Sequence, residues 1–583
     1  MIARNDIVDF FDYEAEASKA SWDALMKLSL KDRIRKRKAV KDVFLDKEAQ
    51  GVSPEGETLL KLNVSKNLSD FKEGECLILH KEELSSGIKC TINRFEGDGV
   101  IMVSVFGMNM PSDLSSYYDK PLVLDKDCVD LRQHVYYNFT AELKSESQFW
   151  ENCLLNKHDK PVFEKVDECK EELDDTIKNF KLNLTDKQRE AIVNSMAAKD
   201  YYLVQGPPGT GKSFVLGLII LEELAYFNHK VVVIGPNHLA INNVLGQVLS
   251  LCPGYNPIIL KVGQSYNAPT KKCECEGKEV GIENIQRING YAVAEIKEPL
   301  LIGLTPHSLY TSRGRGLECD TLIIDEAGQM TIPLAIMGLI KAKKIIFAGD
   351  HKQLPPIITS DKVGEEMKQS AFKRIMNDEN CTMLDVSFRM CEPICNFVSD
   401  LFYEGKVRPY VQGRGNKLIC SDPLYSFDTP VVLHNVEDDG EQTSEKEAEF
   451  ISSIVASYLD KGLPANEIAV LAPFRAQAAT IRRAIRRNVQ IPDDANTEVA
   501  VDTVDKMQGQ EREVIIFSMT SGNADYISEM AEFLYNPNKL NVAFSRAKSK
   551  LIVVGNLTEV GKINSVEYPH IHKMLESQYV TII

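Results

Sequence analysis

Short apolar runs separated by turn residues dominate the first part of this chain after its N-terminal segment. Between residues 58 and 132 they recur at regular spacing, with turns such as Glu96-Gly-Asp-Gly99 between them. This pattern predicts short β-strands that form a small β-barrel. The expected strands cover residues 58–64, 76–79, 88–92 and 100–105.

The segments on both sides of the predicted barrel differ from it in charge content and in the spacing of their apolar residues. Residues 1–57 and 133–183 are rich in charged residues, and their apolar positions follow helical spacing. We therefore expect an N-terminal helical segment at 1–57 and a helical stalk at 133–183 that carries the barrel.

From residue 184 onward, short all-apolar runs alternate with amphipathic stretches. Such runs are typical of parallel strands covered by helices on both faces. The alternation occurs twice and predicts two α/β domains, at residues 184–360 and 361–583. A more polar stretch at about 264–295 predicts a helical insertion in the first. The expected strands are 200–205, 230–234, 258–262, 300–304, 321–325 and 344–348, followed by 431–434, 467–471, 498–502, 514–518 and 551–555.

The composition fits a soluble globular protein, because 44% of the residues are hydrophobic and 26% are charged. A net charge of −16 argues against a chain that coats nucleic acid non-specifically, but it leaves room for one locally basic groove. The longest apolar stretch, 214–227, is too short to span a bilayer. We therefore expect no membrane partner and a cytoplasmic location.

One basic cluster, residues 31–41, stands out against this acidic background. It predicts either a surface that contacts phosphates or a solvated helix face whose charge is offset by the acidic residues of segment 9–16. The sequence does not separate these interpretations.

Residues 206–213 fit the phosphate-loop pattern G-x-x-x-x-G-K-[ST] at every fixed position. A predicted strand precedes the loop and a predicted helix follows it. Backbone N–H groups and the helix dipole are expected to bind phosphate oxygens, with Lys212 at the β- and γ-phosphates and Ser213 on Mg²⁺. The expected nucleotide-binding residues of the loop are Gly206, Pro207, Pro208, Gly209, Thr210, Gly211, Lys212 and Ser213.

Two further polar segments follow predicted strands of the first α/β domain. Asp325 is expected to hold Mg²⁺, and Glu326 to take a proton from the attacking water. Gln353 is expected to sense the γ-phosphate, unless residues 349–356 are an ordinary proline-rich loop. Because the second domain has no phosphate loop, we expect nucleotide in the cleft between the domains.

These motifs and their order resemble those of the superfamily 1 helicases. The likeness is greatest to the branch that contains the nonsense-mediated-decay RNA helicase and the immunoglobulin-mu-binding helicase. It rests on residues 184–188, 206–213, 325–329, 349–356, 386–390, 501–511 and 540–548. The resemblance implies two RecA-like domains in tandem, an accessory barrel on a stalk, and movement in the 5′→3′ direction.

The resemblance also implies roles for residues whose function spacing alone does not give. Gln188 would read adenine, Phe388 would stack on it, and Gly509 and Glu511 would contact the nucleotide. Arg389 and Arg546 would act as arginine fingers on the γ-phosphate. The residues expected to contact the strand are Pro236, Asn237, Thr305 and Thr503. For Asn237 and Thr305, helix capping is an equal alternative.

The sequence thus predicts an ATP-dependent helicase or translocase that uses Mg²⁺ and acts as a monomer on single-stranded DNA or RNA. The alternative is an ATP-switched clamp on a strand or protein partner, which hydrolyses ATP without unwinding. The same motifs would support both functions.

Overall fold

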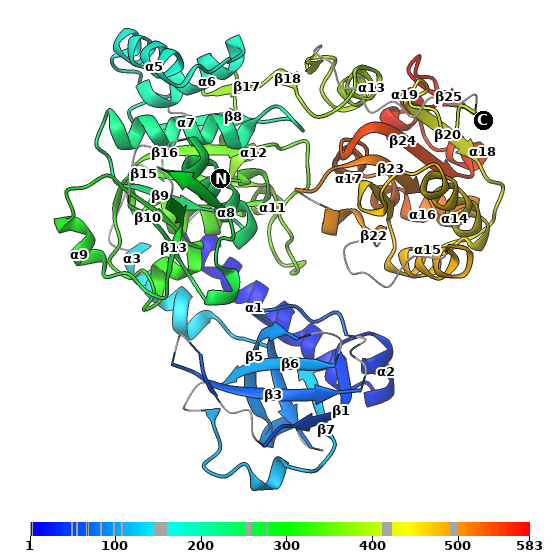
Figure 1. Ribbon diagram of the computed structural model, residues 1–583, viewed down its shortest axis with the longest axis horizontal. Coiled ribbons are helices and arrows are strands. Elements are labelled where there is room, and N and C mark those ends of the chain that lie inside the picture. The colour runs from blue at the N-terminus through cyan, green and yellow to red at the C-terminus, as the bar shows by residue number, and fades with distance from the viewer. Residues whose placement is uncertain are drawn as a thin grey trace.

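The computed structural model describes the chain apart from residues 1, 3, 48–50, 54–55, 66, 68, 82–83, 97–98, 106–108, 144–159, 252–257, 276–277, 411–421, 490–498 and 508. Two α/β domains lie side by side, and a β-barrel lies below them (Figure 1). Among the described residues, no helix is both long and apolar enough to cross a bilayer.

The barrel is a closed, antiparallel sheet. Its strand order is β1-β7-β4-β5-β6-β3, and β1 pairs again with β3 to close it, while the short β2 extends from β3. Apolar side chains that alternate along the strands fill the interior. The strands are β1 (Ala39–Leu45), β2 (Gly51–Val52), β3 (Thr58–Val64), β4 (Cys76–His80), β5 (Ile88–Phe95), β6 (Val100–Val105) and β7 (Leu122–Lys126), with short helical turns η1 (Leu84–Ser86) and η3 (Ser115–Tyr117).

The predicted barrel is confirmed, but its predicted start at residue 58 is wrong because β1 and β2 precede it. Among its described residues, segment 1–57 is therefore helical in α1 (Arg4–Met26) and α2 (Leu30–Arg35) alone. The sequence did not predict β1 because the charged residues Lys41 and Asp42 interrupt its apolar run, and its first three residues lie within the basic cluster.

The helices within the predicted stalk, residues 133–183, pack in two separate places. α1 packs with η4 (Arg132–Tyr136) and α3 (Tyr137–Leu143) on the first α/β domain. The rings of Phe11 and Tyr136 stack with centroids 3.9 Å apart. α5 (Val166–Phe180) instead packs on α6 (Asp186–Ala197). Part of the predicted stalk, residues 144–159, lies outside the described residues.

The first α/β domain contains an eight-stranded parallel sheet in the order β13-β10-β14-β9-β15-β16-β8-β17. Helices α6, α7 and α8 cover one face, and α10, α12 and η7 cover the other together with α1 and α3. The strands are β8 (Tyr201–Gln205), β9 (Val231–Ile234), β10 (Ile258–Val262), β13 (Glu283–Ile285), β14 (Leu300–Gly303), β15 (Cys319–Ile324), β16 (Ala342–Gly349) and β17 (Cys381–Met383). The helices are α7 (Lys212–Ala225), α8 (His238–Leu251), η6 (Ser265–Asn267), α9 (Gly290–Glu295), η7 (Pro306–Tyr310), η8 (Ala327–Gln329), α10 (Ile332–Leu339), α11 (Glu365–Lys368) and α12 (Ala371–Ile375).

Two predictions for this domain need correction. β17 pairs with β8, so the sheet extends beyond the boundary predicted at residue 360. The stretch 264–295 was expected to contain a helical insertion, but it contains the hairpin β11 (Lys272–Cys275)–β12 (Lys278–Gly281) and the edge strand β13. Of the residues that the structure describes in this stretch, those of α9 and the single turn η6 are helical.

The second α/β domain contains a six-stranded parallel sheet in the order β22-β21-β23-β24-β20-β25. Helices α14 and α15 cover one face, and α13, α16, α17 and α19 cover the other. The strands are β20 (Val431–Asn435), β21 (Ile468–Ala472), β22 (Ala500–Thr503), β23 (Arg512–Ser518), β24 (Ala547–Gly555) and β25 (Thr581–Ile582), with β18 (Val386–Ser387) and β19 (Arg408–Pro409) as a separate pair. The helices are α13 (Glu392–Phe402), α14 (Glu445–Asp460), η9 (Ala465–Glu467), α15 (Arg475–Asn488), η10 (Val504–Met507), α16 (Ala524–Leu534), α17 (Pro537–Phe544), α18 (Leu557–Val560) and α19 (Pro569–Leu575).

Candidate nucleotide site between the two α/β domains

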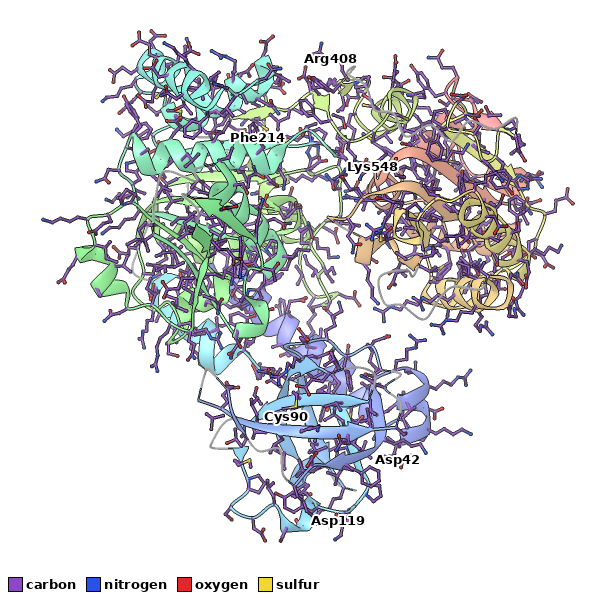
Figure 2. All side chains as sticks on the ribbon, viewed as in Figure 1. Asp42, Cys90, Asp119, Phe214, Arg408 and Lys548 are labelled. Atoms are coloured by element: carbon purple, nitrogen blue, oxygen red, sulfur yellow. The ribbon has the colours of Figure 1, made fainter. Side chains whose placement is uncertain are left out.

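A cleft of about 420 Å³ lies between the two α/β domains. Its size falls within the range of roughly 300–1,000 Å³ that is usual for small-molecule pockets. Phe214 marks the first-domain side in Figure 2, and Lys548 stands on the second-domain side. Beyond the whole phosphate loop, the cleft is lined by Phe214, Ala240, Asn243, Gln247, Asp325, Glu326 and Gln353, and from across the cleft by Phe388, Arg389, Gly509, Glu511 and Arg546.

The phosphate loop joins β8 to α7, and its glycines are required by its geometry. Gly209 and Gly211 have φ angles of +75° and +80°, in the left-handed region that favours glycine. A Cβ atom on Gly209 would lie 2.4 Å from Cβ of Arg389. The backbone N–H of Phe388 donates to the Gly209 carbonyl over 2.7 Å. The loop is therefore packed directly against the segment that carries Arg389.

Lys212 ends between two carboxylates. Its Nζ donates to Oδ1 of Asp325 over 2.6 Å and to Oε1 of Glu326 over 2.7 Å. Burial favours a lower pKa for Lys212, but the two carboxylates outweigh that effect and raise it. Lys212 therefore carries its charge at neutral pH. Phosphate oxygens that enter the loop can replace the carboxylates as its partners.

Glu326 is held in one orientation at the end of β15. Its φ angle of +54° is unusual for a residue other than glycine and indicates local backbone strain. Nε2 of Gln329 donates to its Oε2 over 2.8 Å. Against the effect of burial, the contact with Lys212 lowers the pKa of Glu326. The carboxylate is thus ionised and able to accept a proton.

The protein offers two oxygen donors for Mg²⁺ in this cleft, the hydroxyl of Ser213 and the carboxylate of Asp325. Among the residues that the structure describes, no group of three or more His, Cys, Asp or Glu side chains could hold a metal by itself. Mg²⁺ commonly takes one or two protein oxygens and completes its shell with phosphates and water. The two residues fit that chemistry.

Two guanidinium groups reach the cleft from its far side. Arg546 is only 3% exposed, and it donates from Nη2 to Oε1 of Gln353 over 3.0 Å. Arg389 donates from Nε to Oε2 of Glu511 over 2.6 Å. Burial and, secondarily, repulsion from Arg389 lower the pKa of Arg546 to about 9. Two cations crowded in a dry cleft attract an anion between them.

A buried hydrogen-bond network beside this cleft joins the two α/β domains. Asp350 follows β16, and its carboxylate accepts from Gln353 Nε2 (2.9 Å) and Gln205 Nε2 (3.1 Å). The hydroxyl of Tyr403, from the second domain, donates to the same carboxylate over 2.5 Å. Asn541 in turn donates to that hydroxyl over 2.7 Å. Sequence reasoning missed this network, because only the three-dimensional fold brings these side chains together.

Gln188 lies behind the phosphate loop and not on the wall of the cleft. It is 3% exposed, it forms a capping box with Thr185 at the start of α6, and its Nε2 donates to the Thr210 carbonyl over 3.1 Å. Without nucleotide, the side chain thus supports the loop, and contact with adenine stays a prediction. Its spacing with Thr185, T-x-x-Q, was a visible signal for capping.

Phe388 does line the cleft, as expected for a ring that contacts nucleotide. Its ring centroid lies 4.7 Å from that of Tyr410, at an interplanar angle of 42°. Tyr410 thus packs against the Phe388 ring, which itself lines the cleft.

The predicted strand contacts lie at the carboxyl ends of strands. Pro236 and Asn237 follow β9, Thr305 follows its neighbour β14, and Thr503 ends β22 of the second sheet. Oδ1 of Asn237 accepts from the backbone N–H of Ala240 over 2.9 Å, and Oγ1 of Thr305 lies 2.9 Å from Oγ of Ser308. The capping alternative is thus realised for Asn237, and Thr305 is hydrogen-bonded locally.

The fold and the cleft together define the class of protein: a P-loop ATPase with two RecA-like domains. Two family models described as "AAA domain" match the chain, one at residues 183–289 and 296–361 and the other at 367–558. The chain thus belongs to the proteins that carry these two AAA domains in tandem.

Three relatives illustrate the likeness. The chain is 28% identical over 445 residues to the DNA polymerase alpha-associated DNA helicase A of Schizosaccharomyces pombe, which covers 66% of this chain and 65% of that protein. It is 26% identical over 497 residues to an uncharacterized ATP-dependent helicase of Methanocaldococcus jannaschii, with 68% and 72% covered. It is 27% identical over 425 residues to the DNA replication ATP-dependent helicase/nuclease dna2 of S. pombe, with 67% of this chain but only 29% of that protein covered.

Proposed function

We propose that the chain is an ATP-driven motor on single-stranded nucleic acid. One observation carries the proposal: Arg389 and Arg546 face the phosphate loop across the cleft, so a triphosphate bound at Lys212 contacts groups from both domains. ATP then favours closure of the cleft, and hydrolysis removes the bridge.

The cleft residues have distinct proposed roles in ATP hydrolysis. Lys212 exchanges its carboxylate partners for phosphate oxygens, and Glu326 accepts the proton of the attacking water. Arg546 and Arg389 stabilise the negative charge that develops on the transferred phosphoryl group. Mg²⁺, held by Ser213 and Asp325, would neutralise phosphate charge when bound. Gln353 contacts both Arg546 and Asp350, which suits it to report loss of the γ-phosphate to both domains.

The strand is proposed to cross the carboxyl edges of the two sheets, where Pro236, Asn237, Thr305 and Thr503 lie. Alternate gripping by the two domains would then move the protein along it. Movement in the 5′→3′ direction rests on the family resemblance. The names of two relatives refer to DNA, so DNA is the first substrate to test and RNA the second. Monomeric action and a cytoplasmic location stay predictions from the sequence.

The test is ATP hydrolysis with single-stranded DNA, with single-stranded RNA and with neither, together with displacement of a labelled strand from duplexes that carry a 5′ or a 3′ tail. We expect strong stimulation by at least one nucleic acid and displacement from the 5′-tailed duplex. The Lys212→Met variant serves as the inactive control. Absence of both stimulation and displacement on every substrate would refute the motor.

A clamp is the second candidate, and the contacts between the domains favour it. Asn538 and Asn541 donate to the carbonyls of Gln353 and Lys352 across the cleft, and Tyr403 donates to Asp350. If these contacts persist through the ATP cycle, the domains cannot alternate. Stimulated ATP hydrolysis without strand displacement would identify the clamp.

A further inference from the structure

The basic cluster at 31–41 is not neutralised by the acidic residues of α1. Asp12 lies 3.7 Å from Arg132, and Glu16 pairs with Lys362 over 2.8 Å. Glu14 accepts from the backbone N–H groups of Thr359 and Ser360. These acidic residues tie α1 to the stalk and the first α/β domain. Among the described residues, Asp12, Glu14 and Glu16 therefore do not pair with the basic cluster.

The cations in and directly after α2 differ in exposure: one is buried against the barrel, and three are exposed to solvent. Arg33 is buried and makes two hydrogen bonds of 2.9 Å to the carboxylate of Asp125, which fixes α2 to the barrel. Lys31, Arg35 and Lys36 are exposed. No ion pair joins these three side chains to a carboxylate within the described part of the chain. α2 and its C-cap Lys36 therefore present three exposed cations beside one exposed carboxylate, that of Asp32, which is hydrogen-bonded to Ser29 at the start of the helix.

A second basic helix meets this surface at Asp70. The carboxylate of Asp70 lies 3.5 Å from Nη1 of Arg37, after α2, and 3.4 Å from Nη1 of Arg475, the first residue of α15. Figure 1 shows α2 on the barrel and α15 on the second domain on either side of this junction. We call the surface formed by α2 and α15 the basic junction. The arginines of α15 are Arg475, Arg482, Arg483, Arg486 and Arg487. Three of them pair with carboxylates of the second domain: Arg482 with Asp502 (3.8 Å), Arg483 with Glu445 (3.7 Å) and Arg487 with Glu449.

Cations crowd at the basic junction. The pKa of Lys38 is lowered by burial first and then by repulsion from Lys126, with Arg475 adding to it. Asp70 is shared between Arg37 and Arg475, and other carboxylates pair with Arg482, Arg483 and Arg487, so these groups balance part of the charge. Within the part of the chain that the structure describes, exposed cations that form no ion pair remain on both helices, at Lys31, Arg35, Lys36 and Arg486. In a chain with a net charge of −16, such a concentration indicates a polyanionic ligand.

The basic junction continues the proposed path of the strand. β21 and β22 are neighbours, and Ala472 at the end of β21 pairs with Thr503 at the end of β22. Arg475 begins α15 directly after that strand end. A strand that passes Thr503 therefore leaves the second domain beside Arg475 and α2.

We infer that the basic junction binds the sugar–phosphate backbone of nucleic acid that extends beyond the path across the two α/β domains. The inference rests on the proposed function and adds a second contact region to it. The ligand class is the phosphodiester backbone, because exposed lysine and arginine side chains on two helices offer charge but no base-reading pocket. Binding there is expected to be independent of sequence and sensitive to salt.

The test is the full-length triple variant Lys31→Glu, Arg35→Glu and Lys36→Glu. These side chains are exposed and make no contact that the fold requires, whereas Arg33 is left intact. Affinity is measured for oligonucleotides of about 10 and about 30 nucleotides over a range of salt concentrations. A matched control variant, Lys297→Glu, Lys562→Glu and Lys573→Glu, makes the same change in net charge at exposed lysines elsewhere.

We expect the triple variant to bind the long oligonucleotide at least about tenfold more weakly, with a salt dependence shallower by about 2, since each lost contact to a single strand removes about 0.7 from the slope. Affinity for the short oligonucleotide, and the ATP hydrolysis that it stimulates, should not change. The control variant should retain full affinity for both.

Unchanged affinity for the long oligonucleotide would overturn the inference and leave an acidic protein as the ligand of this surface. An equal loss in the control variant would also overturn it, because net charge would then explain the result. A failure of the proposed function looks different: the short oligonucleotide would not stimulate ATP hydrolysis by the unmodified protein.

Discussion

Replacement of Arg546 by alanine separates catalysis from nucleotide binding. The side chain is 3% exposed, and its hydrogen bonds go to neutral oxygens, the Val542 carbonyl at 3.1 Å and Oε1 of Gln353 at 3.0 Å. No carboxylate neutralises it within the described residues, so its charge is available to phosphate. Arg389 differs, because Glu511 already pairs with it at 2.6 Å.

The expected loss follows from this contrast. An arginine that stabilises phosphoryl transfer contributes roughly 10³–10⁵ in kcat, and a thousandfold loss corresponds to about 4 kcal/mol. We expect Arg546→Ala to lower the hydrolysis rate by at least about 10³-fold while ATP affinity falls less than about threefold, because the phosphate loop and Lys212 supply most ground-state binding. Arg389→Ala should cost less in rate, because Glu511 already offsets part of the charge of Arg389.

The assay is single-turnover hydrolysis at saturating nucleic acid, with ATP affinity measured separately by displacement of a fluorescent nucleotide. Arg546→Lys is the matched variant: it keeps the charge but loses the planar group that contacts Gln353 and phosphate together, so it should recover only part of the rate. A matched loss of rate and affinity in Arg546→Ala, or a loss below tenfold, would refute the role of this arginine in the transition state.

Three further predictions concern other parts of the molecule. Glu326→Gln should abolish turnover but retain ATP-dependent strand binding in a gel-shift assay; retained turnover would remove Glu326 as the base. Tyr403→Phe removes the hydroxyl that joins Asp350 to the second domain, and strand stimulation of ATP hydrolysis should fall severalfold while unstimulated hydrolysis stays the same; unchanged stimulation would exclude Tyr403 from coupling. Burial raises the pKa of Glu447 to about 7, so the folded state holds a proton there that the unfolded state releases near pH 4.5, and stability should fall by about 3 kcal/mol as pH rises between these values. Glu447→Gln should abolish this dependence in thermal unfolding followed against pH, and a profile that matches the parent would contradict the assignment.

The sequence predicted the parts of the fold that local patterns determine. The parallel strands around the phosphate loop are continuous apolar runs, and the motif after β8 constrains the loop and α7 by itself. The sequence also indicated Asp325, Glu326 and Gln353, because each follows the end of a strand whose pattern is visible.

Long-range pairing determined the parts that the sequence did not predict. β17 contains only three residues, Cys381–Met383, and its place beside β8 depends on the whole sheet. The closure of the barrel through β1 and β3 is likewise non-local. The network at Tyr403 joins side chains 53 positions apart in sequence at Asp350, and no local pattern marks them as partners. Gln188 combines both kinds of signal: the local pattern T-x-x-Q accounts for its capping box with Thr185, while its contact with adenine stays a prediction from the family resemblance.

The most direct test of this account is a structure of the protein with single-stranded nucleic acid and a nucleotide that mimics the transition state of hydrolysis. We predict that Lys212 leaves Asp325 and Glu326 for the phosphates, and that Arg546 and Arg389 both contact the γ-phosphate position. A nucleotide bound to the first domain alone, with Arg546 still on Gln353 and Lys212 still between its carboxylates, would contradict the account.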